Sequence, residues 1–283
     1  MKKIVGLLGY PLGHTVSPAM HNAAYKQLGL NFEYVPFEVE PKELKEAVNG
    51  LRAMHIAGFN VTVPHKEAIV AILDEVTELA RIIGAVNTVE NQEGKLVGYN
   101  TDAPGFLDSL REDYNFEPRG KRVVILGAGG ASRAVATILA EVKAKSLTIG
   151  DTIEPKAAAL AEYLSSYLDI KCSAVEMNSP ALQKALDNAD LLVNATPIGM
   201  HPNVKALPLD QKMKLNKNCF VYDLVYNPAE TALLQLAKDS GCQIASGLGM
   251  LVRQGAQAFE IFTGEEAPIE TMFAAAQNAL RVK

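Results

Sequence analysis

The chain has 283 residues, of which 48% are hydrophobic and 21% are charged, and it carries a formal net charge of −5. This length accommodates one large domain or two medium ones, each with its own core. The acidic balance argues against binding to nucleic acids or to a membrane surface. The sequence also lacks an apolar run of about 18 residues that would cross a bilayer, and its start lacks the apolar stretch of a cleavable signal peptide. We therefore expect a cytoplasmic protein.

Cysteine and histidine usage predicts no metal centre. Cys172, Cys219 and Cys242 are odd in number and widely spaced, which suggests neither a disulfide framework nor a zinc site. The histidines show no metal-ligand spacing either, and we interpret them as turn, surface or positioning residues: His14, His21, His55, His65 and His201.

The first part of the chain alternates between predicted strands and helices. Strands are predicted at residues 3–9, 31–39, 58–63, 85–90 and 95–99. Helices are predicted at 17–28 and 41–54, with two short helices between 64 and 83. Ser17 is expected to be the N-cap of the first helix and Pro18 its first helical residue. The alternation indicates a mostly parallel sheet.

A predicted helix at 104–113 and a candidate hinge at Glu117-Pro-Arg-Gly120 lead into a second α/β part. Its predicted strands lie at 122–126, 146–150, 171–175, 190–194, 219–223 and 243–245. The intervening helices are predicted at 131–141, 155–168, 179–187 and 231–239. This count matches a doubly wound parallel sheet. Two amphipathic helices, 250–262 and 269–282, follow, and we expect at least one of them to pack on the first part.

The segment Arg122-Val-Val-Ile-Leu-Gly-Ala-Gly-Gly-Ala-Ser-Arg133 runs from an apolar strand directly into a glycine cluster and a helix. Such a run is typical of a parallel strand that is buried on both faces. Gly127 permits the tight turn, Gly129 lets the backbone approach a pyrophosphate, and the helix offers free N–H groups and its positive dipole end. Ser132 stands in place of the usual third glycine. The motif predicts a dinucleotide site, although a glycine-rich turn without a nucleotide has the same pattern.

Polar residues gather at strand ends in the first part. Lys66 follows the strand that contains Asn60-Val-Thr-Val63, while Gly84–Thr88 and Tyr99–Asp102 flank the next two strands. Proteins of the α/β class build their sites at such strand ends. A solvated lysine at a helix start and an Asx turn at Asn100 are the simpler interpretations of single residues. Together the clusters indicate convergence on a polyhydroxylated ligand.

Over essentially its full length the chain resembles the shikimate dehydrogenases, which reduce 3-dehydroshikimate to shikimate in aromatic amino acid (chorismate) biosynthesis. The resemblance rests on eight motifs in order: Gly9-Tyr-Pro-Leu-Gly-His-Thr-Val-Ser-Pro18, Asn60–Lys66, Gly84–Thr88, Asn100-Thr-Asp102, Gly127–Ser132, Asn194-Ala-Thr-Pro-Ile-Gly-Met200, Tyr222-Asp-Leu-Val-Tyr226 and Gly247-Leu-Gly-Met-Leu-Val-Arg-Gln254. It implies an α/β fold of two domains with a cleft between them. Residues 1–103 plus 248–283 would form the substrate domain, with a mostly parallel sheet, and residues 104–247 a Rossmann-type nucleotide domain.

The resemblance also implies the site residues. Lys66 matches the catalytic lysine and Asp102 its partner. Thr15 and Ser17 match the pair that binds the substrate carboxylate, with Thr15 in place of the more usual serine. Ring hydroxyls are implied to contact Thr62, Asn87, Asp102 and Gln254, and Tyr226 matches a position near the substrate. The implied cofactor contacts are Gly127, Ala128, Gly129, Gly130, Ala131, Asp151, Thr152, Thr196, Leu224 and Gly247.

These roles make physical sense. Two hydroxyls and the free N–H groups of a helix start suit a carboxylate. The Lys66 ammonium can polarise the C3 carbonyl and donate a proton to the developing alkoxide, and in the reverse direction the neutral amine accepts it. Asp102 favours the charged form of the lysine, whereas a dry cleft opposes it.

Cofactor choice is where the sequence departs from the family. NADP-using members typically carry Asn-Arg-Thr after the second strand of the nucleotide domain, and this chain has Asp151-Thr152-Ile153. A carboxylate there accepts from the 2′-hydroxyl of NAD and repels a 2′-phosphate. The arginine fork that suits a phosphate is missing, and Lys156 offers only a point charge. The family implies NADP, whereas these residues favour NAD.

Three other functions stay open. An NAD-dependent quinate/shikimate dehydrogenase that works oxidatively would suit Asp151. A non-catalytic ligand-sensing module on the same fold would need neither Lys66 nor Asp102. A folate-type dehydrogenase would leave Thr15, Ser17 and Gln254 without a role. We expect small-molecule partners (shikimate or 3-dehydroshikimate, and also quinate), no nucleic acid or membrane, and a monomer or homodimer.

Overall fold

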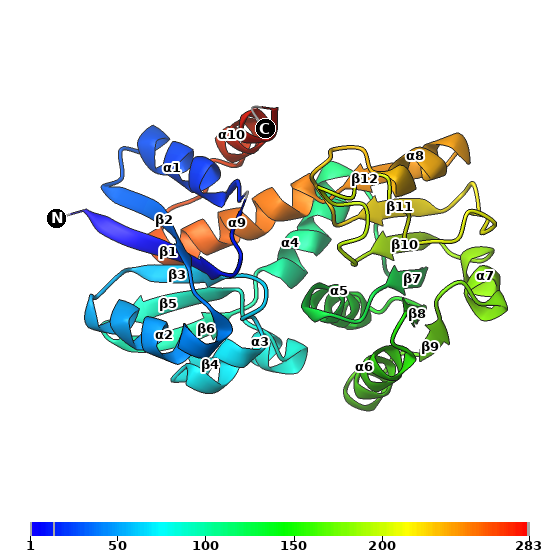
Figure 1. The fold of residues 1–283 in the computed structure, drawn as a ribbon, viewed down its shortest axis with the longest axis horizontal. Helices are drawn as coiled ribbons and strands as arrows, with labels where there is room; N and C mark the ends of the chain where they lie inside the picture. The colour runs from blue at the N-terminus through cyan, green and yellow to red at the C-terminus, as the bar shows by residue number, and fades with distance from the viewer. Residues whose placement is uncertain (1, 14, 282–283) are drawn as a thin grey trace. The chain divides into compact units, whose positions relative to one another are not determined.

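The computed structural model describes residues 2–13 and 15–281 and places the strands in two six-stranded sheets (Figure 1). Each sheet belongs to its own unit of the chain: the first unit is Met1–Phe106 with Leu251–Lys283, and the second is Leu107–Met250. Within the described residues, no helix has the length and apolar character needed to span a membrane.

The sheet of the first unit has the strand order β2-β1-β3-β5-β6-β4. Its strands are β1 (Lys3–Gly9), β2 (Phe32–Glu38), β3 (Gly58–Val61), β4 (Glu75–Val76), β5 (Thr88–Gln92) and β6 (Lys95–Tyr99). β1 pairs in parallel with β2 and β3, and β4 with β6, whereas β5 runs antiparallel to both of its neighbours. The prediction of a mostly parallel sheet is confirmed. The two-residue strand β4 was not predicted, because it is too short to carry a hydrophobic period.

The helices of the first unit differ from the prediction mainly at their ends. They are α1 (Ser17–Gln27), η1 (Pro41–Glu43), α2 (Leu44–Ala53), η2 (Ala68–Ile72), α3 (Glu78–Ile83) and α10 (Ile269–Arg281), and two further helices, α4 (Asp102–Asp108) and α9 (Leu248–Thr263), begin or end in it. α10 packs against α1. Asn100 Oδ1 accepts from the Ala103 N–H at 3.1 Å, so α4 starts two residues earlier than the predicted 104.

The prediction that Ser17 is the N-cap of α1 is wrong. Val16 occupies the cap position and Ser17 is the first helical residue. The Ser17 N–H donates to Thr15 Oγ1 at 3.2 Å. A threonine hydroxyl two residues upstream therefore satisfies this backbone donor, while the Met20 N–H, which an N-cap serine would accept, donates to the Val16 carbonyl at 3.1 Å.

The histidines occupy varied environments. His55 has a φ of 52° at the turn after α2. His21 and His65 are buried, and a ring nitrogen of His65 lies 2.7 Å from the Val39 carbonyl oxygen. His14 lies outside the described residues.

A hydrophobic core lies between the first sheet and the helices that follow β2 and β3. Phe59 of β3 and Leu96 of β6 are fully buried there with Val48 of α2 and Ile69 of η2. Each such side chain contributes about 1.5–3 kcal/mol relative to full exposure. This packing fixes β3, whose carboxyl end leads to Lys66.

The second unit is the predicted doubly wound sheet. Its strand order is β12-β11-β10-β7-β8-β9, and every pair is parallel. The strands are β7 (Arg122–Leu126), β8 (Ser146–Asp151), β9 (Cys172–Glu176), β10 (Leu191–Asn194), β11 (Phe220–Asp223) and β12 (Gln243–Ser246). The helices between them are α5 (Gly130–Glu141), α6 (Glu154–Tyr167), α7 (Pro180–Leu186) and α8 (Ala232–Asp239), and a π-helical turn, η3 (Ser109–Asp113), precedes β7.

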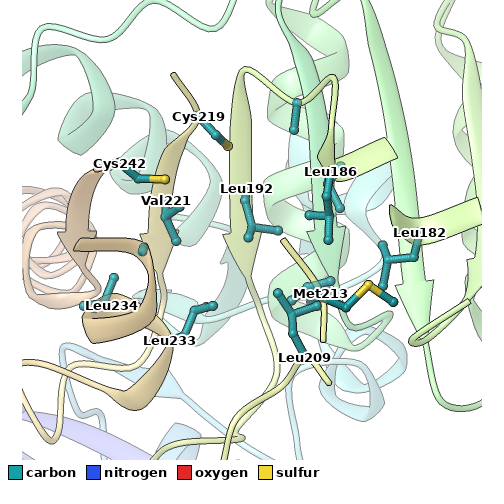
Figure 2. Close-up of a cluster of buried hydrophobic side chains, with 14 residues drawn as sticks. Leu182, Leu186, Leu192, Leu209, Met213, Cys219, Val221, Leu233, Leu234 and Cys242 are labelled. Carbon is teal, nitrogen blue, oxygen red and sulfur yellow. The ribbon is translucent and has the colours of Figure 1, made fainter. Parts of the chain in front are cut away.

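One core of the second unit joins β10 and β11 to their covering helices (Figure 2). Leu192 and Val221 on the two strands pack with Leu233 and Leu234 of α8 and with Leu186 of α7. The strand order reverses between β7 and β10, where Leu126 and Asn194 are register partners. In doubly wound sheets the ligand site lies outside the carboxyl ends of the strands at this switch point.

Candidate active site

Lys66 and Asp102 form an ion pair in the first unit. Lys66 Nζ lies 2.7 Å from Asp102 Oδ2, and their side chains are 21% and 9% exposed. Asp102 is the first residue of α4, and Lys66 lies between β3 and η2. The Val86 N–H donates to the Lys66 carbonyl at 2.8 Å, which ties the lysine segment to the chain before β5. The ammonium is therefore held in place on a side chain that remains partly exposed.

Asn87 completes the surroundings of the carboxylate. Its Nδ2 donates to Asp102 Oδ1 at 3.0 Å and to Thr101 Oγ1 at 2.9 Å, and its Oδ1 accepts from the Thr101 N–H at 2.7 Å. Asp102 thus has Lys66 on one oxygen and Asn87 on the other. Buried charges persist only when they are paired and hydrogen bonded, and this carboxylate meets both conditions.

Gln254 reaches the same cluster from α9. Asn87 Nδ2 donates to Gln254 Oε1 at 3.3 Å, across 167 residues of sequence. A Cβ at Gly105 would lie 2.6 Å from the Gln254 backbone nitrogen, so only glycine lets α4 approach α9 this closely. The structure therefore brings four of the predicted residues together: Lys66, Asn87, Asp102 and Gln254.

The predicted carboxylate-binding pair lies at the start of α1. Thr15 and Ser17 are joined by the hydrogen bond from the Ser17 N–H to Thr15 Oγ1. The first N–H groups of a helix have no partner within it, so an anion placed there is stabilised by them and by the helix dipole. Thr62 lies against Gly9 at the end of β1, where a Cβ would collide with the Thr62 methyl group. The missing side chain at Gly9 makes room for Thr62.

The glycine-rich turn of the second unit fits a dinucleotide pyrophosphate. Gly127 has a φ of 103°, and a Cβ on it would lie 3.1 Å from the Ala195 carbonyl oxygen. Gly129 is the N-cap of α5, and a Cβ built there meets nothing within 4 Å. Gly129 thus leaves open space beside the first turn of α5, whose N–H groups have no partner within the helix, which is the environment that a pyrophosphate needs.

Asp151 organises this turn from the end of β8. Its Oδ2 accepts from the Ala128 N–H and its Oδ1 from the Ile153 N–H, both at 2.8 Å. Thr152 Oγ1 lies 3.5 Å from Asp151 Oδ1. The carboxylate therefore already accepts two backbone donors, a use that the sequence did not reveal.

A buried polar group ties together the loops after β10 and β11. The N–H and hydroxyl of Thr196 donate to Asn194 Oδ1, whose Nδ2 donates to Asp223 Oδ1 at 2.8 Å. Thr231 Oγ1 donates to the other Asp223 oxygen at 2.6 Å. Burial raises the pKa of Asp223, and these donors act against that rise. The arrangement fixes the backbone around Thr196.

The remaining predicted residues of the second unit follow β11 and β12. The Leu224 N–H donates to the Asn194 carbonyl at 2.9 Å. A Cβ on Gly247 would collide with the Leu224 carbonyl oxygen, so this crossing requires glycine. Tyr226 lies two residues after Leu224, and burial raises the pKa of its phenol.

Family models match three stretches of the chain. Residues 7–89 match the shikimate dehydrogenase substrate binding domain and residues 247–277 the shikimate 5′-dehydrogenase C-terminal domain. Residues 123–243 match the saccharopine dehydrogenase NADP binding domain. The chain is also 49% identical over 278 residues to the shikimate dehydrogenase (NADP(+)) of Methanopyrus kandleri, covering 98% of this chain and 96% of the relative. The chain belongs to the shikimate dehydrogenase family.

Solved structures of shikimate dehydrogenases share the fold. One, in complex with NADP+, has a TM-score of 0.91 at 43% identity and covers 99% of this chain and 96% of its own. Shikimate 5-dehydrogenase from Listeria monocytogenes, solved with shikimate and NAD, has a TM-score of 0.89 at 38% identity and covers 96% and 95% of the two chains. The predicted family and fold class are confirmed.

Several buried polar residues beside the predicted site residues of the two units were missed at the level of sequence. Asn60, Thr88, Thr101 and Asn194 lie inside the quoted motifs, and their signal was a polar side chain within or beside a buried apolar strand. Tyr34 carried no such signal, since a tyrosine is an ordinary strand residue.

Proposed function

We propose that the chain is a shikimate dehydrogenase, which reversibly reduces 3-dehydroshikimate to shikimate with NADP as its cofactor, in the biosynthesis of chorismate and the aromatic amino acids. The observation that carries this proposal is the Lys66–Asp102 ion pair at a strand end, with Asn87 and Gln254 around it. The substrate and the cofactor are assigned from the relatives, which are shikimate dehydrogenases (NADP(+)).

The two units are assigned different binding roles. We assign residues 1–103 plus 248–283 to the substrate domain and residues 104–247 to the dinucleotide domain. The compact units Met1–Phe106 with Leu251–Lys283 and Leu107–Met250 support this division. The separate locations of the acid–base cluster and of the glycine-rich turn support it as well.

Lys66 is assigned the proton transfer. Its ammonium polarises the C3 carbonyl of 3-dehydroshikimate and donates a proton to that oxygen as the alcohol forms. In the oxidative direction the amine accepts the hydroxyl proton. Asp102 holds the ammonium through Oδ2, and Asn87 prevents the carboxylate from turning away. Bound NADPH supplies the hydride.

Substrate orientation is assigned to the predicted substrate-binding residues. Thr15, Ser17 and the start of α1 bind the carboxylate. Thr62, Asn87, Asp102 and Gln254 bind the ring hydroxyls, and Tyr226 lies beside the substrate. The amide and carboxylate groups offer both donors and acceptors, as a polyhydroxylated ring requires.

The cofactor is assigned to the glycine-rich turn. Gly127–Ala131 bind the pyrophosphate, Asp151 and Thr152 lie toward the adenine ribose, and Thr196, Leu224 and Gly247 line the nicotinamide side. NADP rests on the relatives, while Asp151 favours a second candidate function, the NAD-dependent oxidation of shikimate and quinate. On the family resemblance alone we propose a cytoplasmic location and a monomeric or homodimeric state.

One assay tests the proposal: absorbance of the reduced nicotinamide, with shikimate or quinate crossed against NADP or NAD. Turnover of shikimate with NADP is the expected result. Preferred turnover of quinate with NAD would instead establish the second candidate. Binding of shikimate without turnover of any pair would favour a ligand-sensing module and overturn both enzymatic functions.

A further inference from the structure

Asp223 is a buried carboxylate at the carboxyl end of β11, and three groups donate hydrogen bonds to it. Oδ1 accepts from Asn194 Nδ2 at 2.8 Å and from the Val225 N–H at 3.0 Å. Oδ2 accepts from Thr231 Oγ1 at 2.6 Å. Asn194 ends β10, Val225 follows β11 and Thr231 is the N-cap of α8. One side chain therefore joins the ends of two neighbouring strands to the start of a helix.

The first connection runs from Asp223 through Asn194 to Thr196. The orientation of the Asn194 amide is settled by two backbone groups, because the Thr196 N–H can only donate and the Ile198 carbonyl can only accept. Asn194 Oδ1 accepts from that N–H at 3.1 Å, and Nδ2 donates to that carbonyl at 3.3 Å. The Thr196 hydroxyl donates to Asn194 Oδ1 at 2.7 Å and accepts from the Ile198 N–H at 3.2 Å. One lone pair of this hydroxyl remains, so Thr196 offers an acceptor to a ligand.

The second connection fixes the peptide group between Leu224 and Val225. The N–H and C=O of a planar trans peptide point in opposite directions, so the bond from the Val225 N–H to Asp223 also sets the direction of the Leu224 carbonyl. That carbonyl oxygen lies against Gly247. The Leu224 N–H donates to the carbonyl of Asn194, the register partner of Asp223. The peptide groups on both sides of Leu224 are therefore held.

These fixed groups lie beside the glycine-rich turn. A Cβ on Gly127 would lie 3.1 Å from Thr196 Cγ2, and Asn194 is the register partner of Leu126, the residue before the turn. A doubly wound sheet binds a dinucleotide across the point where its strand order reverses, with one nucleotide half on each side. Asp151 on β8 lies on the side assigned to the adenosine half, so the ends of β10 and β11 lie on the side of the nicotinamide half.

We propose that Asp223 is a positioning residue for the nicotinamide half of the dinucleotide. It holds Thr196 and the Leu224–Val225 peptide in the orientations that receive this half. The inference rests on the proposed function, which supplies the cofactor. The nicotinamide carboxamide and the ribose hydroxyls carry N–H and O–H donors, which suit an acceptor such as the Thr196 oxygen.

Removal of the carboxylate should weaken binding of the nicotinamide half alone. Asn194 Nδ2 and the Val225 N–H would lose a buried acceptor, and both segments would turn to find another. Ordering them again would then become a cost of binding the nicotinamide half. The turn at Gly127 and the Asp151 carboxylate keep their own hydrogen bonds, so the adenosine half should bind as before.

Two ligands separate the halves of the cofactor: NADPH, and 2′,5′-ADP, which lacks the nicotinamide and its ribose. Asp223→Ala is expected to weaken NADPH binding about fivefold or more, the order expected for a lost hydrogen bond, and to change 2′,5′-ADP binding by less than about twofold. Asp190→Asn is the matched control, because Asp190 accepts from Arg122 at the opposite end of β10. It should change neither dissociation constant. Titration calorimetry with each ligand provides the measurement.

Asp223→Asn separates hydrogen-bond positioning from charge. An asparagine can keep an oxygen facing the Val225 N–H, which can only donate, and turn its NH2 toward the Thr231 hydroxyl, which can also accept. This variant should lose stability and still bind NADPH within about twofold of the wild type. A loss as large as that of Asp223→Ala would show that the negative charge matters and would overturn the proposal.

Asn194→Ala keeps the test decisive if Asp223→Ala does not fold. It removes the connection to Thr196, leaves the bonds of Asp223 to Val225 and Thr231 in place, and should also weaken NADPH but not 2′,5′-ADP. Equal weakening of both ligands, or of neither, would overturn the proposal while the wild type still oxidises shikimate with NADP. A wild type that neither binds NADPH nor oxidises shikimate would overturn the proposed function, and the positioning role with it.

Discussion

Lys66 Nζ lies 2.7 Å from Asp102 Oδ2, although 36 residues separate the two in the chain. The lysine follows a strand and the aspartate begins a helix, so neither position depends on the other locally. Their meeting depends on the antiparallel pairing of β3, β5 and β6, which brings the segments before β5 and after β6 beside the end of β3. The sheet thus places a proton donor and its counter-charge together.

The first prediction concerns this donor. Lys66→Ala should lower kcat for shikimate oxidation by about 10²–10⁴-fold, the range for general acid–base groups, while KM changes little. Lys95→Ala is the control, because Lys95 pairs with Glu75 at the exposed surface. Steady-state kinetics of both variants provide the measurement. Near-native turnover of Lys66→Ala would remove the lysine from the chemistry.

The second prediction concerns the carboxylate. Thr15→Ala and Ser17→Ala should each raise KM for shikimate and leave KM for NADP unchanged, because both residues lie at the start of α1 in the substrate unit. Loss of one hydrogen bond to a charged group corresponds to about 1.5–3 kcal/mol. Ser166→Ala, on the exposed face of α6, is the control. Variants that keep shikimate KM but lose dinucleotide affinity would contradict the assignment.

The third prediction concerns pH and stability. Arg122 donates to both carboxylate oxygens of Asp190, and these side-chain hydrogen bonds lower the pKa of Asp190, assisted by the Arg122 backbone N–H and opposed by burial. A depressed pKa in the folded state adds stability above the unfolded value of about 3.9, and this stability disappears as the pH falls through the folded value. Asp190→Asn should therefore lower the urea midpoint at pH 7, with the difference closing below about pH 4.

A variant of Arg122 tests whether the pH-dependent stability comes from its ion pair with Asp190. Arg122→Ala should lower the midpoint at pH 7 and should remove most of the further effect of Asp190→Asn. A pH-independent difference between wild type and Asp190→Asn would show that the carboxylate acts through packing and not through its charge.

Sequence patterns predicted the local part of this structure well. β1 and β7 begin and end at the predicted residues, because an apolar run bounded by glycine leaves little choice of register or length. The same patterns could not predict the contact between Tyr34 and Asn60. Their strands, β2 and β3, both pair with β1, where Tyr34 lies opposite Val5 and Asn60 lies opposite Leu7. This register brings the Tyr34 phenol to Asn60. Contacts set by the register of distant strands leave no mark on local sequence.

Competition between hydrogen-bond partners explains the other differences. Ser17 has an N-cap sequence, but the Met20 N–H, which an N-cap serine would accept, donates to the Val16 carbonyl instead. Asp151 was expected to face the adenine ribose, and the alignment of β7 with β8 brings the Ala128 N–H to its carboxylate as well. In both cases the residue type was informative and the choice of partner depended on the fold.

The last prediction concerns the cofactor and returns to Asp151. Asp151→Asn with Thr152→Arg should move the ratio of specificity constants toward NADP by a factor of ten or more, at least about 1.4 kcal/mol. The change removes a negative charge that repels the 2′-phosphate and adds an arginine fork that binds it. Thr152 is exposed, so the arginine enters without displacing the core.

Asparagine also has a structural cost in this position. It keeps a single acceptor oxygen, so one of the two bonds to the Ala128 and Ile153 N–H groups is lost, and the turn loosens for both cofactors alike. The ratio of specificity constants cancels this shared loss, and for that reason it is the quantity to measure. Thr152→Arg alone should move the ratio part of the way, since it leaves the carboxylate in place. If neither variant moves the ratio, the exposed Lys156 on the first turn of α6 is the alternative phosphate ligand, and Lys156→Ala should then weaken NADP while sparing NAD.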